Sequence, residues 1–225
     1  MFLSRLFLNP RNRAVLRDLA DCQALHRTIL AAFPAAESKG RGAREQFGVL
    51  HRLESDRRRG RLVLYVQSLV LPAWSALPAD YLLREPGLDN PGVKPVAQIY
   101  QSFHPGTVLS FRLRANPSRK IDTKTGPDGR RRHGRRVELV TEEAQLAWLT
   151  RQAAAGGFQV LAARLSGLSK DRGRRQGAAI TMAWVQFDGH LRVLEPATFY
   201  QTLARGIGPG KAYGLGLLSL APPGG

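Results

Sequence analysis

Apolar segments follow one another in the same order in both halves of this chain. In the first half, apolar residues over positions 2–8 predict a buried strand, which an Asn-Pro pair ends. Apolar residues recur at helical spacing over positions 15–33 and predict a helix. Asp21 could instead be an N-cap, in which case the helix would start near residue 22.

Two strands and a second helix are expected to follow in the first half. Positions 47–53 and 62–69 have the composition of strands, and the charged stretch 56–60 between them favours a hairpin. A weaker helical pattern covers positions 72–83. The predicted order is therefore strand, helix, two strands and helix.

Proline and glycine become frequent between positions 86 and 106, which predicts a boundary between two domains. We expect an N-terminal domain at residues 1–90 and a C-terminal domain at residues 91–225. The second half is predicted to contain strands at 108–115, 137–140, 158–163, 180–187, 191–194 and 215–220, helices at 142–154 and 196–204, a polar loop at 166–176 and a turn at Asp188-Gly189. The predicted fold class is α+β, with two tandem ferredoxin-like (RRM-like) βαββαβ domains.

The charge of the chain predicts a phosphate-rich partner. Thirty-four Lys and Arg against 17 Asp and Glu give a formal net charge of +17 and a pI of about 11.3. Such an excess is typical of proteins that bind nucleic acid. A basic ribosomal protein or a protein at a membrane surface would have a similar charge.

The single cysteine and the short apolar runs indicate in which compartment the protein is expected. Cys22 is alone, which excludes an intramolecular disulfide and a cysteine-based zinc site and favours a reducing compartment such as the cytoplasm. The apolar start of the chain is too short for a secretion signal, and no later run is long enough to cross a bilayer. We therefore expect a cytoplasmic protein with no membrane partner.

Two basic clusters in the second half are candidate contacts with a nucleic-acid backbone, against the alternative that they only keep the chain soluble. The first contains several glycines, which would let a loop adapt to phosphates. The predicted contact residues are Arg112, Arg114, Arg119, Lys120, Arg130, Arg131, Arg132, Arg135 and Arg136 in the first cluster and Lys170, Arg172, Arg174 and Arg175 in the second.

A glycine-rich run near the end of the chain, residues 206–216, invites a comparison with nucleotide-binding loops. It is not a P-loop, because Arg205 stands where the first glycine is needed and Ala212 where Ser or Thr is needed. Two interpretations stay open. The run could form a turn that leads into the last strand, or Gly208, Gly210 and Lys211 could contact a phosphate.

The five histidines have no spacing typical of metal ligands, and no nucleophile motif of a triad hydrolase is present. We therefore expect no metal and no cofactor. His26 lies on the apolar face of its predicted helix, near one end of that face. A histidine in such a place is more often a core residue than a catalytic one, and both roles stay open here.

Taken together, five segments resemble the CasE-type CRISPR RNA-processing endoribonucleases of type I-E systems, in the RAMP superfamily. The resemblance covers nearly the whole chain. The segments are LFLNPRNRAVLRDLADCQALHRTI at residues 6–29, FRLRANPSRK at 111–120, EEAQLAWLTRQAAAGGFQVL at 142–161, FDGHLRVLEP at 187–196 and GIGPGKAYGLGLLSLAP at 206–222.

The resemblance implies that two ferredoxin-like domains bind the CRISPR repeat stem-loop, cut the precursor RNA at its 3′ base and keep the product within the type I-E surveillance complex. It also implies that His26 is the catalytic histidine and that residues 206–216 face the RNA. Some members have a tyrosine three residues before this histidine, where this chain has Gln23. Glutamine cannot transfer a proton at neutral pH, so its assistance would be positional or electrostatic.

The implied chemistry is attack by the ribose 2′-OH on the neighbouring phosphate, with His26 moving a proton and no metal involved. Arg27 and Lys211 are candidates for stabilising the phosphorane. The alternative is a non-catalytic RNA-binding structural subunit of a ribonucleoprotein, in which His26 only packs the core. A basic ribosome-associated protein is a third interpretation.

Overall fold

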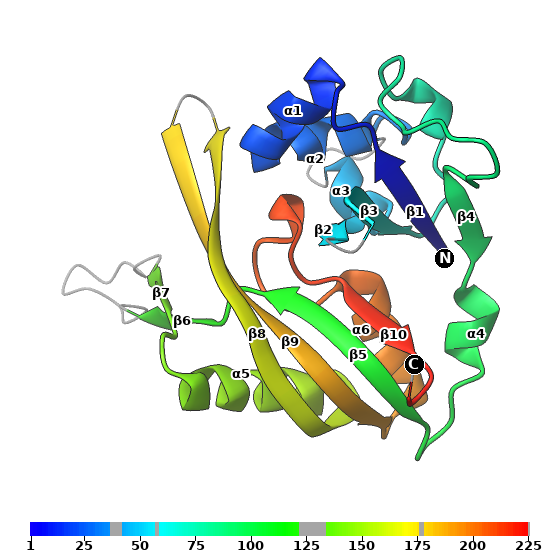
Figure 1. Ribbon diagram of the computed structural model, residues 1–225. Helices are drawn as coiled ribbons and strands as arrows, with labels where there is room; N and C mark the ends of the chain where they lie inside the picture. Colours follow the sequence, from blue (N-terminus) through cyan, green and yellow to red (C-terminus); the bar gives the residue numbers. More distant parts are fainter. Residues whose placement is uncertain (37–41, 57–58, 122–133, 176–177, 225) are drawn as a thin grey trace.

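Each half of the protein contains one four-stranded antiparallel sheet (Figure 1). The computed structural model describes residues 1–36, 42–56, 59–121, 134–175 and 178–224. The two sheets have equivalent strand orders, and helices cover one face of each.

The first sheet has the order β2-β3-β1-β4. Its strands are β1 (Phe2–Leu8), β2 (Leu50–Asp56), β3 (Arg61–Ser68) and β4 (Gly92–Pro95). β1 lies in the interior and pairs antiparallel with both β3 and β4. Because β4 follows residue 90, the sheet of the first half continues past the boundary that the sequence predicts there.

Two short helices, α1 (Arg13–Ala20) and α2 (Cys22–Leu30), pack against the first sheet. The prediction of one helix over residues 15–33 is wrong, because Asp21 has an extended backbone between them, with φ −141° and ψ 105°. The Asp21 carboxylate accepts a hydrogen bond from the backbone N–H of Gln23 and caps α2. The alternative start near residue 22 is therefore confirmed.

The helix predicted at residues 72–83 is also wrong. Only one 3-10 turn, η1 (Trp74–Ala76), forms there, because Pro78 in the middle of the segment cannot donate a helical hydrogen bond. The first half thus has the ferredoxin-like strand order without its second long helix; a short helix, α3 (Ala43–Gln46), precedes β2.

The second sheet has the order β10-β5-β9-β8, formed by β5 (Val108–Ala115), β8 (Phe158–Arg175), β9 (Ala178–Val193) and β10 (Leu218–Ala221). Helices α5 (Glu142–Ala155) and α6 (Pro196–Arg205) lie on one face (Figure 1). Phe158, Phe187 and Phe199 are fully buried in the core between them. The order strand, helix, two strands, helix, strand confirms the α+β class and the ferredoxin-like fold.

β8 and β9 form one long hairpin that reaches from the second sheet to α2 (Figure 1). The strands predicted at 158–163, 180–187 and 191–194 are confirmed as parts of β8 and β9, but the loop predicted at 166–176 and the turn predicted at Asp188-Gly189 are wrong, because the strands continue through both. Gly189 lies inside β9, where a Cβ atom would approach the Ala162 carbonyl oxygen to 2.0 Å. The glycine allows a close strand contact beside a register shift rather than a turn.

The second half also contains four short elements. A small hairpin of β6 (Ser118–Ile121) and β7 (Arg135–Glu138) lies between β5 and α5. Helix α4 (Ala97–Gln101) follows β4, and the 3-10 turn η2 (Lys211–Tyr213) lies in the glycine-rich run.

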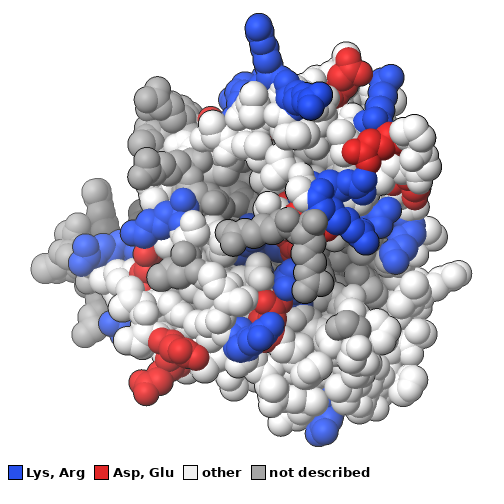
Figure 2. All heavy atoms as spheres, in the orientation of Figure 1, with Lys and Arg blue, Asp and Glu red and all other residues white. Residues whose placement is uncertain are grey.

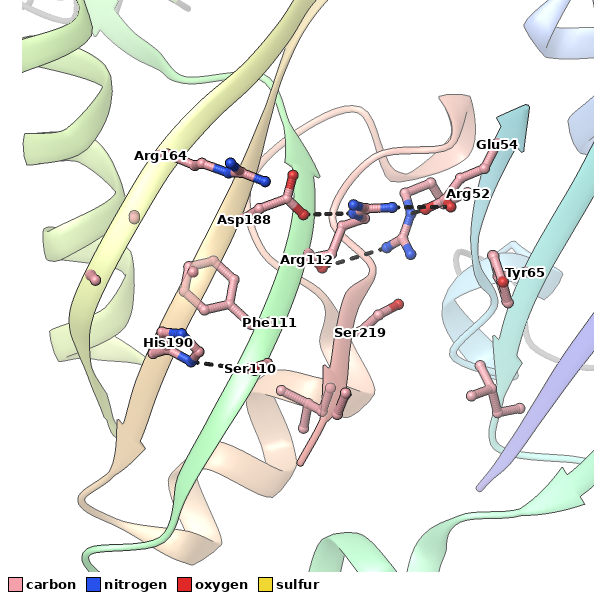
Figure 3. Close-up of a pocket in the computed structure, with 16 residues that line it drawn as sticks. Arg52, Glu54, Tyr65, Ser110, Phe111, Arg112, Arg164, Asp188, His190 and Ser219 are labelled. Carbon is pink, nitrogen blue, oxygen red and sulfur yellow. Dashed lines mark hydrogen bonds and ion pairs between the residues drawn. The ribbon is translucent and has the colours of Figure 1, made fainter. Parts of the chain in front are cut away.

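An ion pair and a hydrogen bond connect the two halves beside an open cavity of about 730 Å³ (Figure 3). Arg112 of β5 donates from Nε to Asp188 Oδ1 of β9 at 2.6 Å, and its Nη1 lies 3.3 Å from Glu54 Oε2 of β2. The buried Arg52 pairs with Glu54 at 2.6 Å and donates to the Leu217 carbonyl at 3.1 Å. This network fixes the position of β2 relative to the second sheet.

Candidate functional site

His26 lies on the buried face of α2 against His51 of β2. The two imidazole rings are stacked, with centroids 6.1 Å apart and planes inclined by 21°. His26 is 8% exposed and His51 is 1% exposed. The structure therefore joins the histidine singled out in the sequence to a second histidine that the sequence did not single out.

Both rings are held in the neutral form. Burial and the positive charge of Arg44 lower the pKa of His26 from 6.5 to about 4. Burial and the neighbouring His26 lower the pKa of His51 to about 3. At neutral pH, His26 is thus a proton acceptor without a positive charge of its own.

Acid is expected to destabilise the protein through this pair. In the unfolded chain both histidines bind a proton near pH 6.5, whereas in the folded chain they do so near pH 4 and pH 3. Between these values the unfolded state binds more protons, so the free energy of unfolding falls as pH falls, by up to about 1.4 kcal/mol per pH unit for each histidine. Urea titrations from pH 7 to pH 4 measure this slope.

Replacing one histidine of the buried pair tests this explanation of the pH slope. His51→Phe should remove about half of the pH slope, because it removes one of the two buried histidines whose pKa is lowered. An unchanged slope in His51→Phe would contradict the assignment of acid sensitivity to the buried pair.

The glycine-rich run brings a cation to these histidines. Its turn η2 packs against α2 and β2, the elements that carry His26 and His51. Lys211 Nζ donates to the Gly208 carbonyl at 2.6 Å, and burial followed by the charge of Arg44 lowers the pKa of Lys211. Arg44 therefore influences both His26 and Lys211.

The glycines of this run are required by the backbone. Gly206, Gly208 and Gly210 have φ between 73° and 83°, a region that other residues rarely adopt. The Gly216 amide donates to the Arg114 carbonyl at 2.8 Å, and its carbonyl accepts from Ile207 at 2.9 Å. The run is thus a turn that leads into β10 and that also places Lys211 near α2.

Gly206→Ala should destabilise the fold more than Gly60→Ala. Both positions have positive φ, so both variants carry backbone strain of about 1 to 2 kcal/mol. A Cβ at Gly206 would also lie 2.7 Å from Leu50 and 2.9 Å from the Gly216 oxygen, whereas a Cβ at Gly60 would have no atom of the described residues within 4 Å. The crowding should cost about 1 to 3 kcal/mol more in the free energy of unfolding, measured by urea titration. Equal losses would show that the run is not closely packed.

Gln23 and Arg27 have different relations to His26. Gln23 lies one turn earlier on α2, on the same side of the helix, and is partly exposed. Arg27 is exposed on another side. The contact of His26 with His51 and the charge effect of Arg44 on His26 could not be predicted, because they arise only in the folded chain and neither His51 nor Arg44 belongs to a sequence motif.

Part of the first basic cluster lies on the β6–β7 hairpin. Arg119 and Lys120 of β6 and Arg135 and Arg136 of β7 are exposed. Figure 2 shows Lys and Arg side chains on the side of the molecule where Figure 1 places this hairpin. Arg130, Arg131 and Arg132 lie outside the described residues.

The sequence had predicted that the second basic cluster lies in a loop, but it lies on strand β8. Lys170 is exposed on β8, and Arg172, Arg174 and Arg175 follow in the same strand, opposite Thr181, Ala179 and Ala178. The side chains of these three arginines lie outside the described part of the chain.

Arg112 and Arg114 lie between the two halves. Arg112 is paired with Asp188 and Glu54. Arg114 donates to the Leu53 carbonyl at 2.9 Å, and its guanidinium lies over the Trp184 ring at 3.9 Å. Both arginines therefore connect β5 to β2 of the first half.

Within the described residues, no group of three or more His, Cys, Asp and Glu side chains could hold a metal ion. A search of the same residues finds no helix that is long and apolar enough to cross a membrane.

Comparisons with known proteins agree with this architecture. The family model described as CRISPR associated protein matches residues 1–222. The CRISPR-associated endoribonuclease Cse3 of Thermus thermophilus is 36% identical over 234 residues, which cover 99% of this chain and all of the relative. The Cascade subunit CasE of Escherichia coli is 35% identical over 132 residues, which cover 56% of this chain and 63% of the relative.

A solved structure gives the same result in three dimensions. Thermus thermophilus Cse3, bound to an RNA that represents a pre-cleavage complex, matches with a TM-score of 0.78 and 36% identity over 98% of both chains. The chain therefore belongs to the CRISPR-associated protein family and, within it, to the endoribonucleases that include Cse3 and CasE.

Proposed function

We propose that this protein cuts CRISPR precursor RNA at the 3′ base of the repeat stem-loop, without a metal ion, by attack of the RNA's own 2′-OH. The observation that carries the proposal is a neutral, buried His26 that shares the neighbourhood of Arg44 with Lys211 from the other half of the chain. A proton acceptor beside cations is what phosphate attack by a hydroxyl requires.

In the proposed reaction, the 2′-oxygen bonds to the adjacent phosphorus while the bond to the 5′-oxygen breaks. His26 takes the proton of the 2′-OH, and the departing 5′-oxygen takes a proton from water. The products are a 2′,3′-cyclic phosphate and a 5′-hydroxyl. A phosphate bound beside His26 adds negative charge, which raises the pKa of His26 from its low value toward neutrality and makes it a better base.

Cations stabilise the developing charge on the phosphate in this proposal. Lys211 is half-buried and donates to the Gly208 carbonyl, a neutral acceptor that its ammonium would exchange for a charged phosphate oxygen. Gln23, on the side of α2 that carries His26, would donate a hydrogen bond to the phosphate. Arg27 would contact an RNA phosphate outside this site, since it is exposed.

Stem binding is assigned to the second half, through the exposed β6–β7 hairpin, the β8 lysine and arginines, and Gly208 and Gly210 of the glycine-rich run. The Escherichia coli relative is named as a Cascade subunit, which supports retention of the product in a type I-E surveillance complex with other subunits. The lone Cys22 supports a cytoplasmic setting.

Removing charge from β6 should flatten the salt dependence of RNA binding. We expect Arg119→Ala with Lys120→Ala to reduce the slope of log Kd against log salt by about 1.4 to 1.8, since each lost phosphate contact removes about 0.7 to 0.9. Filter binding of the hairpin at several salt concentrations measures the slope. Arg151→Ala, on the exposed face of α5, is the control that should change nothing. An unchanged slope in the double variant would remove this hairpin from the interface.

The proposed function is tested by incubating the protein in excess chelator with its repeat hairpin and with an RNA of the same composition that cannot form the stem. One cut at the 3′ base of the hairpin, and none in the second RNA, is the expected result. Random cutting of both RNAs, or a cut that needs magnesium, would contradict it.

One observation favours a second candidate, a non-catalytic RNA-binding subunit. His26 is as deeply buried as a core residue, and its Nδ1 has no hydrogen-bond partner among the described residues. Tight binding of the hairpin without any cut, in the same assay, would establish that candidate instead.

A further inference from the structure

A smaller cavity, of about 270 Å³, lies beside the histidine pair. Its wall includes Cys22 and Leu25 of α2, His51 of β2 and Tyr213 of η2, with Arg114 and Lys170 from the second half. Cys22 lies one helical turn before His26. The volume is slightly below the roughly 300 Å³ of the smallest drug-sized sites and far above the ~30 Å³ of a water molecule. One planar base would fit.

His51 supplies hydrogen-bonding capacity that the protein does not use. Both of its ring nitrogens are buried, and neither has a partner among the described residues. A neutral imidazole has one donor and one acceptor, and leaving both unpaired in the interior is costly. A ligand with a donor and an acceptor on one edge would satisfy this ring, and every nucleobase has such an edge.

The charges around this cavity suit a nucleotide. Arg114 is fixed toward it by the Leu53 carbonyl and the Trp184 ring, and Lys170 is exposed beside it. The carboxylate in its wall, Asp18, is already bound by Arg17 at 2.8 Å and by the Tyr81 hydroxyl at 2.8 Å. Lys170 is thus exposed for contact with a phosphate, Arg114 adds positive charge while it stays bound within the protein, and the acid is neutralised by its own partners.

We propose that this cavity receives a nucleobase that flanks the scissile phosphate, and that His51 hydrogen-bonds to the edge of that base. This inference rests on the proposed function. A base held one helical turn from His26 would fix its sugar and phosphate beside the catalytic imidazole and so favour the in-line geometry. His51 would then determine where the strand is cut, while the stem supplies most of the affinity.

The test combines RNA and protein changes. Hairpins with an abasic site at either nucleotide flanking the scissile phosphate are cut under single-turnover conditions. We expect one of the two abasic hairpins to be cut at least about tenfold more slowly than the intact one, because orientation is lost, with Kd within about threefold. The other abasic hairpin is the matched control.

Substitutions of His51 then show whether the abasic site and the loss of the His51 ring nitrogens remove the same contact. His51→Phe keeps a flat ring against His26 but has no ring nitrogen, and it should slow the intact hairpin to the rate of the abasic one, with no further loss on the abasic hairpin. His51→Gln retains a donor and an acceptor and should restore part of the difference between the two RNAs. His104→Phe should behave like the parent.

The outcomes separate this inference from the proposed function. If the parent cuts both abasic hairpins as fast as the intact hairpin, no base is bound in this cavity. Additive losses from the abasic site and His51→Phe would also overturn the inference, since the two groups would then act independently. If the parent fails to cut the intact hairpin in any condition, the proposed function itself is wrong.

Discussion

His26→Ala is expected to lower the single-turnover rate of hairpin cleavage by about 10² to 10⁴ while changing the hairpin Kd by less than about threefold. The imidazole accepts the proton of the attacking hydroxyl in our proposal, whereas the basic strands hold the RNA. His26 is almost fully buried, so it adds little surface for binding. Cleavage of a labelled hairpin at saturating protein measures the rate, and filter binding measures Kd.

Two other variants make this result specific. His104→Ala removes an exposed histidine from the second half and should cut like the parent. Gln23→Ala should be less damaging than His26→Ala, because an amide can position a phosphate but cannot transfer a proton at neutral pH. Cleavage by His26→Ala at the parental rate would contradict the assignment. A Gln23→Ala variant slower than His26→Ala would reverse the proposed roles.

The neutral state of His26 has a consequence for this reaction. Burial is the main cause of its low pKa, and Arg44 is the second. The same burial excludes water, which strengthens the interaction between the imidazole and a bound phosphate. An exposed histidine would be easier to protonate but would interact more weakly with the substrate.

The sequence predicted the ferredoxin-like class of both halves but not every element within them, and β4 of the first sheet was not predicted. β1, β5 and the helices α5 and α6 were predicted close to their observed bounds, because their apolar residues recur at the period of a strand or a helix. The segment at 72–83 has a helical pattern too, yet Pro78 in its middle limits it to a single turn.

The β8–β9 hairpin shows a limit of pattern analysis. The outer part of β8 carries charged residues instead of alternating apolar ones, since this strand extends beyond the second sheet and reaches α2. Gly189 was interpreted as a turn residue, although it is needed for the close approach of Ala162. A glycine in a strand and a glycine in a turn look alike when only the local sequence is considered.

The candidate site was predicted only in part. The catalytic role of His26 was predicted through the family resemblance and Lys211 was named from the glycine-rich run, and the folded chain brings the segments that carry them together. His51 could not be predicted, because a histidine between Leu50 and Arg52 in a strand has no distinctive spacing. Its importance follows from ring stacking and burial, which depend on how α2 packs against β2.

The central claim of this account is that the attacking oxygen comes from the RNA. A hairpin with a single 2′-deoxy sugar at the scissile nucleotide lacks that oxygen and should resist cutting completely. It should still bind with a Kd within about threefold of the normal hairpin, since the stem phosphates supply most of the affinity.

The most direct measurement compares this deoxy hairpin with the normal one, both in excess chelator, and identifies the ends of any product. We predict that the normal hairpin is cut once, leaving a cyclic phosphate or 3′-phosphate, and that the deoxy hairpin binds but stays intact. Cutting of the deoxy hairpin would contradict this account. So would loss of all cleavage in chelator with recovery on adding magnesium, because water activated by a metal would then be the nucleophile.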